Sequence, residues 1–282
     1  MSEDSTMRAP EADRRPHLLR AYLSSPFAGL APWILMSLVT GPGRFDIAVW
    51  SAFALSLATF VLSHRRGSSI KPMEVFDLVF FFAVAVFDLF ADAAVTDWLE
   101  LWAGELTNVV LTLFVLVTIL IRQPFTLAYA RETTPAEYHH NPLFIRINYV
   151  ITWVWAGAFA FQTAMGLIGD ALLHDSGNYW TGWVLQYLAV IFAFVFTDFY
   201  PDYATARVRH EPTRSLTELI DWLPVFVLIS GAAGLILGGI SSTLAWVMVV
   251  VGAVGELVVI SLQRRQRAAA ARAAGTPTDT PR

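Results

Sequence analysis

Eight apolar segments alternate with short polar connections along the chain. They span residues 27–41, 45–63, 72–96, 99–121, 146–168, 179–199, 223–239 and 242–262. Because the apolar residues form continuous runs without period-two alternation, the pattern predicts helices and not the strands of a barrel. The first and seventh segments are shorter than the roughly 20 residues that a full crossing requires. The pattern therefore predicts an all-α polytopic membrane helix bundle with about eight transmembrane or re-entrant helices.

Composition supports this class of protein. Of the 282 residues, 56% are hydrophobic and 15% are charged, whereas a soluble domain carries about 25% charged residues. The chain contains no cysteine, which excludes disulfide bonds, Cys-ligated zinc and thiolate catalysis. We expect a basic tail over residues 1–26, a membrane bundle over 27–262, and a tail over 263–282 that begins basic and ends disordered.

Basic residues gather in alternate connections. They occur in the tail before residue 27, from Arg65 to Lys71, from Arg122 to Arg146, from Arg207 to Arg214, and in the tail from Arg264. Because Lys and Arg are retained on the cytoplasmic side of a membrane, this alternation predicts that both termini are cytoplasmic. Because the membrane topology accounts for the positions of the basic residues, we expect no nucleic-acid partner.

The first apolar segment has two interpretations. It contains Pro32 and ends in Gly41-Pro42-Gly43, so it is either a full crossing or a half-helix that re-enters and is buried against protein. A re-entrant segment would leave the basic N-terminus outside, against the positive-inside bias. A crossing is therefore favoured, and the re-entrant alternative stays open.

The middle of the chain carries an ordered set of motifs. Arg122-Gln123-Pro124-Phe125 closes a helix, Arg131-Glu132 and Pro135 follow, and Arg146-Ile147-Asn148 opens a Trp-rich helix. This run resembles the intracellular septation protein A (YciB) family of bacterial inner-membrane proteins. Pro32, Asp46-Ile47 and Ala58-Thr59 extend the resemblance, which covers about residues 28–200.

The chain also departs from that family. It has acidic residues where the family commonly has Gly in the third helix and Lys at the start of the fourth. Trp153 and Trp155 are displaced from the usual Trp spacing, and residues 223–262 add a helical hairpin. The resemblance implies a multi-pass protein of the bacterial inner (plasma) membrane, associated with cell-envelope maintenance and septation. It implies no molecular activity.

Carboxylates interrupt the third apolar segment. Glu74, Asp77, Asp88 and Asp92 follow helical spacing, so one stripe of a continuous helix would carry all four and face protein. A charge near the bilayer centre costs at least about 2.5 kcal/mol on the insertion scale. Glu74 and Asp92, with Asp97, are expected near the two membrane interfaces, whereas Asp77 and Asp88 are expected deeper.

Glu105 adds a carboxylate to the fourth segment, about two turns from its outer end. It would meet Asp88 or Asp92 on the neighbouring antiparallel helix, and two close carboxylates share a proton. The candidate catalytic or proton-relay residues are therefore Asp88, Glu105, Asp77 and Asp92. A shared structural hydrogen bond is the alternative interpretation.

The central basic connection supplies candidate binding residues. Arg122 and Arg146 flank it, Arg131-Glu132 lies within it, and Asp198 ends the sixth helix on the same side. We expect Arg122 or Arg146 to pair with Asp198 or Glu132 and to join helix ends, or alternatively to bind an anionic lipid headgroup. Asn148 is a polar residue inside an apolar helix, where an interhelical hydrogen bond explains it.

Neither a metal nor a cofactor is expected. His139 and His140 are adjacent, so their side chains do not share a helical face and a metal would need other ligands. The expected partners are the lipid bilayer and other envelope or division membrane proteins. Gly234 and Gly238 form one GxxxG spacing with Gly231 nearby, which is consistent with internal packing, the favoured interpretation, or with a homo-oligomer.

Three function classes fit these observations. The leading one is a non-enzymatic envelope protein that acts through helix and lipid contacts, because no catalytic motif is present. The second is a proton-coupled transporter, since carriers use broken helices and buried acids. The third is a terpene-cyclase-like enzyme on a lipid or isoprenoid substrate, in which Asp88 or Glu105 would protonate an olefin among some of the 20 Phe and 10 Trp side chains.

Overall fold

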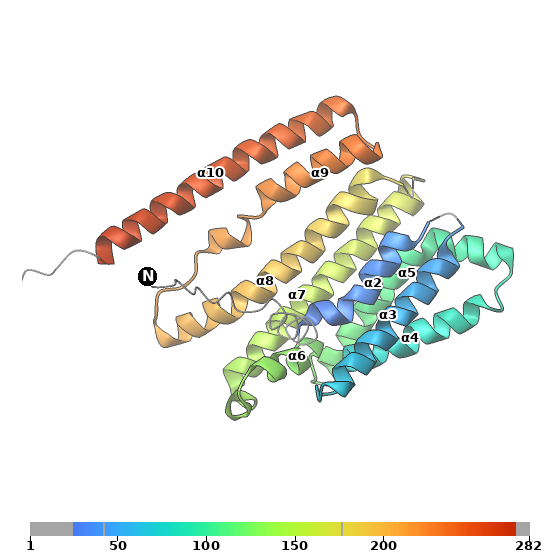
Figure 1. The fold of residues 1–282 in the computed structure, drawn as a ribbon, viewed down its shortest axis with the longest axis horizontal. Coiled ribbons are helices and arrows are strands. Elements are labelled where there is room, and N and C mark those ends of the chain that lie inside the picture. Colours follow the sequence, from blue (N-terminus) through green and yellow to red (C-terminus); the bar gives the residue numbers. More distant parts are fainter. Residues whose placement is uncertain (1–24, 42, 176, 275–282) are drawn as a thin grey trace, which may run out of the picture. The chain divides into compact units, whose positions relative to one another are not determined.

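The computed structural model describes residues 25–41, 43–175 and 177–274, and within them it is built from helices (Figure 1). The helices are α2 (Pro26–Val39), α3 (Phe45–Arg65), α4 (Pro72–Asp88), α5 (Ala93–Leu120), α6 (Phe125–Thr133), α7 (Pro142–Leu167), α8 (Leu185–Arg209), α9 (Leu223–Leu237) and α10 (Ser242–Ala274). Short 3-10 and π-helical turns occupy several connections. The predicted all-α class is confirmed. Residues 1–24 and 275–282 of the expected tails lie outside the described residues.

Among the described residues, six helical segments are long and apolar enough to cross a membrane. They are Phe45–Arg65, Ala93–Leu120, Pro142–Leu172, Tyr179–Arg209, Leu216–Leu237 and Ser242–Arg265. The chain is therefore a multi-pass integral membrane protein. The seventh apolar segment is longer than predicted, because a 3-10 turn from Leu216 precedes α9. The first is short, because the 14 residues of α2 extend only about 21 Å, against a hydrocarbon core of about 30 Å.

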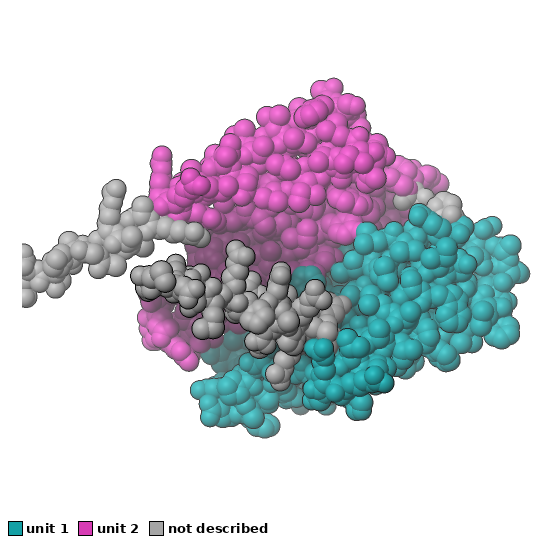
Figure 2. Space-filling view, in the orientation of Figure 1, with its two compact units in different colours: residues 1–164 teal, residues 165–282 magenta. Residues whose placement is uncertain are grey.

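The chain divides into two compact units, residues 1–164 and residues 165–282 (Figure 2). In unit 1, α3 packs closely against both α2 and α4. The buried face of α3 repeats every three or four residues and consists of Phe45, Ala48, Val49, Ala52, Ser56, Thr59 and Ser63. Most of these side chains are small, which lets neighbouring membrane helices approach closely.

The third apolar segment is not one helix, as the sequence analysis expected. α4 ends at Asp88, and Asp92 has an extended backbone and caps α5 by accepting a hydrogen bond of 2.9 Å from the Val95 amide. Asp92 therefore does not belong to the α4 stripe. The predicted stripe is confirmed for Glu74 and Asp77, which lie on the buried face of α4 with Phe81 and Ala85.

Polar contacts show which connections of unit 1 lie at the same end. Glu132 at the end of α6 accepts hydrogen bonds from Ser69, in the α3–α4 connection. At the start of α5, Glu100 accepts hydrogen bonds of 3.0, 3.1 and 3.2 Å from the amides of Gly43, Arg44 and Phe45, and so caps α3. Two of the basic connections thus meet at one end of unit 1. The start of α3 and the N-terminal part of α5 meet at the other.

In unit 2, α9 and α10 lie side by side as a hairpin (Figure 1). A Cβ added to Gly231 would lie 2.7 Å from the Ala245 carbonyl oxygen, and one added to Gly252 would lie 2.4 Å from the Leu228 nitrogen. Only glycine allows the two backbones to come this close. The interpretation of Gly231 as an internal packing residue is confirmed, and Gly252 of α10 provides the matching surface.

Glycine packing in the hairpin can be tested by adding one methyl group. We expect Gly252→Ala to lower the free energy of unfolding by about 1–3 kcal/mol, because backbone atoms must move. Gly157→Ala in α7 is the control, since its Cβ meets nothing within 4 Å, and it should leave stability unchanged or raise it by up to about 1 kcal/mol. Thermal unfolding of both variants in detergent measures the difference. Equal unfolding temperatures for Gly252→Ala and the wild type would contradict the packing argument.

Sidedness can be measured with single cysteines, because the natural chain has none. Cysteines at Ser69 and Ala136 should react with an impermeant thiol reagent from the same side of the membrane, and a cysteine at Thr96 from the opposite side. The positive-inside bias predicts that the shared side is cytoplasmic. Labelling of positions 69 and 96 from one side would refute this arrangement.

Candidate functional site

The most enclosed charged group of unit 1 surrounds Lys71, the residue before α4. Its side chain is 0% exposed, and its Nζ atom lies 3.0 Å from Oε1 of Glu74 and 3.2 Å from Oε1 of Glu132. The ammonium also lies 5.3 Å from the centre of the Tyr129 ring, within cation-π range. We call these residues, with Ser63 and Ser69, the Lys71 cluster.

Local sequence places each member of the Lys71 cluster. Pro72 occupies the first turn of α4, where its missing N–H costs nothing, so Lys71 precedes the helix and Glu74 lies in the first turn. Ser63 comes from the last turn of α3, and its hydroxyl donates to Oε1 of Glu74 at 3.1 Å. The cluster therefore joins the end of α3, the start of α4 and the end of α6.

Hydrogen bonds complete the ion pairs of the Lys71 cluster. Both the amide and the hydroxyl of Ser69 donate to Oε1 of Glu132 at 3.0 Å. Buried ion pairs are stable only where such additional bonds offset the loss of water around the charges. Glu74 lies in the first turn of α4, and its side chain is 2% exposed. Its expected position near a membrane interface stays a prediction.

Asp77 lies one turn further into α4 and is also buried. Its Oδ1 atom accepts a hydrogen bond of 2.7 Å from the indole nitrogen of Trp33 in α2. The Trp33 ring lies 4.8 Å from the rings of both Phe80 and Phe81, measured between centroids. Asp77 therefore sits in an aromatic environment, and its contact with Trp33 holds α2 against α4.

The remaining sequence candidates among the acids lie elsewhere in unit 1. Asp88 is the last residue of α4 and is half-buried, and Asp46 and Trp50 of α3 interact with its carboxylate. Glu105 is buried on α5. The predicted sharing of a proton between Asp88 and Glu105 stays a prediction, and the structure adds Asp46 as a neighbour that sequence reasoning missed.

Asn148 and the central arginines separate into two groups. Asn148 is buried, its side-chain amide donates to the Phe144 carbonyl, and its own backbone carbonyl accepts from the Thr126 hydroxyl at 3.0 Å. It thereby joins α7 to α6. The side chains of Arg122, Arg131 and Arg146 are exposed, and their binding of lipid headgroups stays a prediction.

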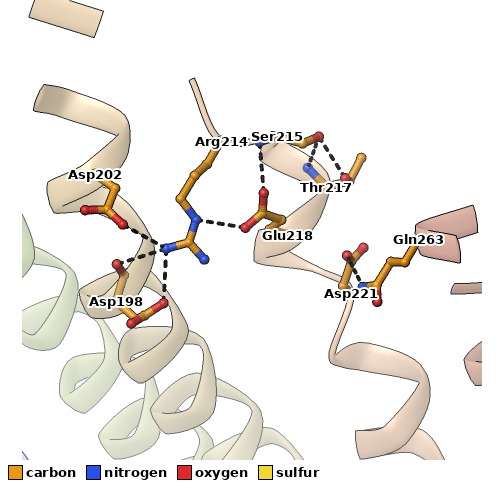
Figure 3. Close-up of polar contacts among 8 residues, drawn as sticks. All are labelled: Asp198, Asp202, Arg214, Ser215, Thr217, Glu218, Asp221 and Gln263. Carbon is orange, nitrogen blue, oxygen red and sulfur yellow. Dashed lines mark hydrogen bonds and ion pairs between the residues drawn. The ribbon is translucent and has the colours of Figure 1, made fainter. Parts of the chain in front are cut away.

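Unit 2 has its own charged group around Arg214 (Figure 3). The guanidinium lies 3.1 Å from Asp198, 3.5 Å from Asp202 and 2.8 Å from Glu218. The hydrogen bond with Glu218, together with the one to Asp198, raises the pKa of Arg214 above its ordinary value. Glu218 also accepts from the Ser215 amide, which fixes the 3-10 turn before α9.

The ion pairs differ from those predicted. Within unit 1, Glu132 pairs with Lys71, so the predicted pairing of Arg122 or Arg146 with Glu132 is wrong. Within unit 2, Asp198 pairs with Arg214, and the alternative pairing of Asp198 with Arg122 or Arg146 stays a prediction. Sequence reasoning missed Lys71 as a site residue although a signal existed, since it is the only lysine in the chain. The side chain of Asp198 is 80% exposed, and exposed pairs contribute at most about 1 kcal/mol.

Comparison with protein-family models, curated proteins and solved structures gives no match for this chain.

Removing the lysine tests whether the Lys71 cluster holds unit 1 together. We expect Lys71→Met to lower the free energy of unfolding by about 3–5 kcal/mol, because two carboxylates lose their buried counter-ion. Arg131→Met is the matched control on an exposed cation of α6 and should change it by less than about 0.5 kcal/mol. Thermal unfolding of the full chain in detergent gives both values, and similar effects of the two substitutions would contradict this role.

Proposed function

We propose that this chain is a bacterial inner-membrane protein that acts in cell-envelope maintenance or septation through helix and lipid contacts. The observation that carries the proposal is the Lys71 cluster. Its single ammonium contacts two carboxylates, and serine donors complete both of them. These polar groups join three helices of unit 1, so they have a structural use that requires no substrate.

The exposed apolar surface is the second support for this proposal. α10 exposes a series of large apolar side chains, which includes Trp246, Val250, Val254 and Leu257. Such a surface is suited to lipid tails or to apolar helices of other membrane proteins. The resemblance to the intracellular septation protein A family, drawn from residues 28–200, implies the same compartment and process.

Deletion of the gene in its own bacterium tests the proposal. We expect deleted cells to show altered cell length and increased sensitivity to osmotic shock, and the wild-type chain to restore both. Arg131→Met should restore them fully, whereas Lys71→Met should restore them only in proportion to the amount of folded protein that remains in the membrane. Folded protein is quantified from detergent extracts of the same cultures.

The outcome that would overturn an envelope role is specific. Deleted cells that keep normal length and normal osmotic resistance through exponential and stationary phase would reject it. Full restoration by Lys71→Met in cells whose folded protein is strongly reduced would reject the assignment of that role to the integrity of the helix bundle.

A further inference from the structure

We propose that Asp77 is a proton-binding site in the membrane bundle, and that protons reach it along Glu74 and Lys71 from the end of unit 1 where Glu132 lies. The inference does not depend on the envelope role, because it concerns the protonation chemistry of α4 alone. Its starting point is the balance of charge among the buried groups.

The Lys71 cluster contains one cation for two carboxylates before Asp77 is counted. Lys71 lies within 3.2 Å of Glu74 and Glu132, and the described residues place no cation at ion-pair distance from Asp77. The hydrogen-bond donor to Asp77 is the neutral indole N–H of Trp33. An uncompensated buried carboxylate takes up a proton instead of staying charged, because the neutral acid loses far less hydration free energy.

The groups that face Asp77 further favour the neutral, protonated form of its carboxyl group. Glu74, three residues earlier on the same face of α4, adds negative charge that favours binding of a proton. From α2 the neighbour is Trp33, which is neutral. From α3 the cluster receives only the Ser63 hydroxyl, and from α6 it receives Tyr129 and Glu132, both in contact with Lys71.

α5 contributes an aromatic ring to this region. Phe114 stacks on Phe76 with 4.3 Å between ring centroids. Glu105, the acid of α5 nearest to Phe114 in sequence, lies nine residues away, which is about 13 Å along a helix. The surroundings of Asp77 thus combine aromatic rings with a nearby negative charge, and the ammonium of Lys71 is paired with Glu74 and Glu132.

A route for the proton follows from the same residues. The side chain of Glu132 is 14% exposed, so it is the member of the cluster through which solvent protons would enter. The proton passes by way of Lys71 and Glu74 to Asp77, whose carboxylate becomes a carboxylic acid, and no electron is transferred. The carbonyl oxygen of the neutral acid still accepts the Trp33 hydrogen bond, so α2 stays in place.

The assignment of the proton to Asp77 bears on the two alternative functions, the proton-coupled transporter and the acid-catalysed enzyme. A proton-coupled carrier and an acid-catalysed enzyme both require a buried neutral carboxylic acid. Asp88, Glu105, Asp77 and Asp92 are the candidates from the sequence, with Asp88 or Glu105 as the acid of the enzyme alternative. The burial of Asp77 and its hydrogen bond to a neutral indole favour Asp77 among them. Asp88 is half-buried at a helix end.

Infrared spectroscopy of the full chain in lipid vesicles tests the proposal directly. The wild type should show the carbonyl stretch of a neutral carboxylic acid at neutral pH, and this band should be lost in Asp77→Asn. The matched control is Asp88→Asn on the same helix, which should keep the band. Glu74→Gln should slow the isotope shift of the band in heavy water several-fold, because it interrupts the route.

Three results would overturn the assignment. They are absence of the band in the wild type, its persistence in Asp77→Asn, and its loss in Asp88→Asn. If Asp77→Asn does not fold, Trp33→Phe replaces it, since this change removes only the donor to Asp77. The carbonyl stretch should then shift to the higher frequency of an acid without a hydrogen bond, and an unshifted band would refute the assignment.

Discussion

The burial of one ammonium group between two carboxylates is the constraint on which unit 1 depends. Lys71 has no access to water, so its charge must be balanced by Glu74 and Glu132, and each acid must find its remaining donors in Ser63 and Ser69. Because these residues come from separate segments, the cluster forms only when the end of α3, the start of α4 and the end of α6 meet. Charge balance thereby fixes the packing of one end of the unit.

The opposite end of unit 1 uses hydrogen bonds of a different kind. Glu100 of α5 accepts from three successive amides at the start of α3, where the unsatisfied N–H groups of a helix carry partial positive charge. Between the two ends, Asp77 and Trp33 join α4 to α2 in aromatic surroundings. A short helix such as α2, with Pro32 inside it, is thus fixed by one buried hydrogen bond and by ring packing.

Close packing of helix backbones stabilises unit 2 more than ion pairs do. The Arg214 group is partly exposed and lies in a connection, so water screens its ion pairs. In the α9–α10 hairpin, glycines on both helices bring the backbones together, and in lipid such close packing replaces the hydrophobic driving force of a soluble core. The two units therefore reach stability by separate physical means.

The sequence by itself determined the all-α class of the protein and the approximate positions of the six described segments that are long and apolar enough to cross a membrane. Long apolar runs can satisfy their backbone groups in lipid only as helices. It also placed Glu74 and Asp77 on one helical face, because that follows from spacing alone. The end of α4 at Asp88 was missed, since residues 89–92 remain apolar enough to hide a break between two helices.

Only the tertiary structure decided which charges meet. Lys71 and Glu132 are 61 positions apart, and no local pattern indicates that the cation of the α3–α4 connection balances the acid of α6. The same holds for Trp33 with Asp77, and for Asp198, whose partner in unit 2 is Arg214 of the next connection. The local sequence determines the charge of a side chain and the face of the helix on which it lies. Its partner depends on which helices pack together, and that is a property of the folded chain.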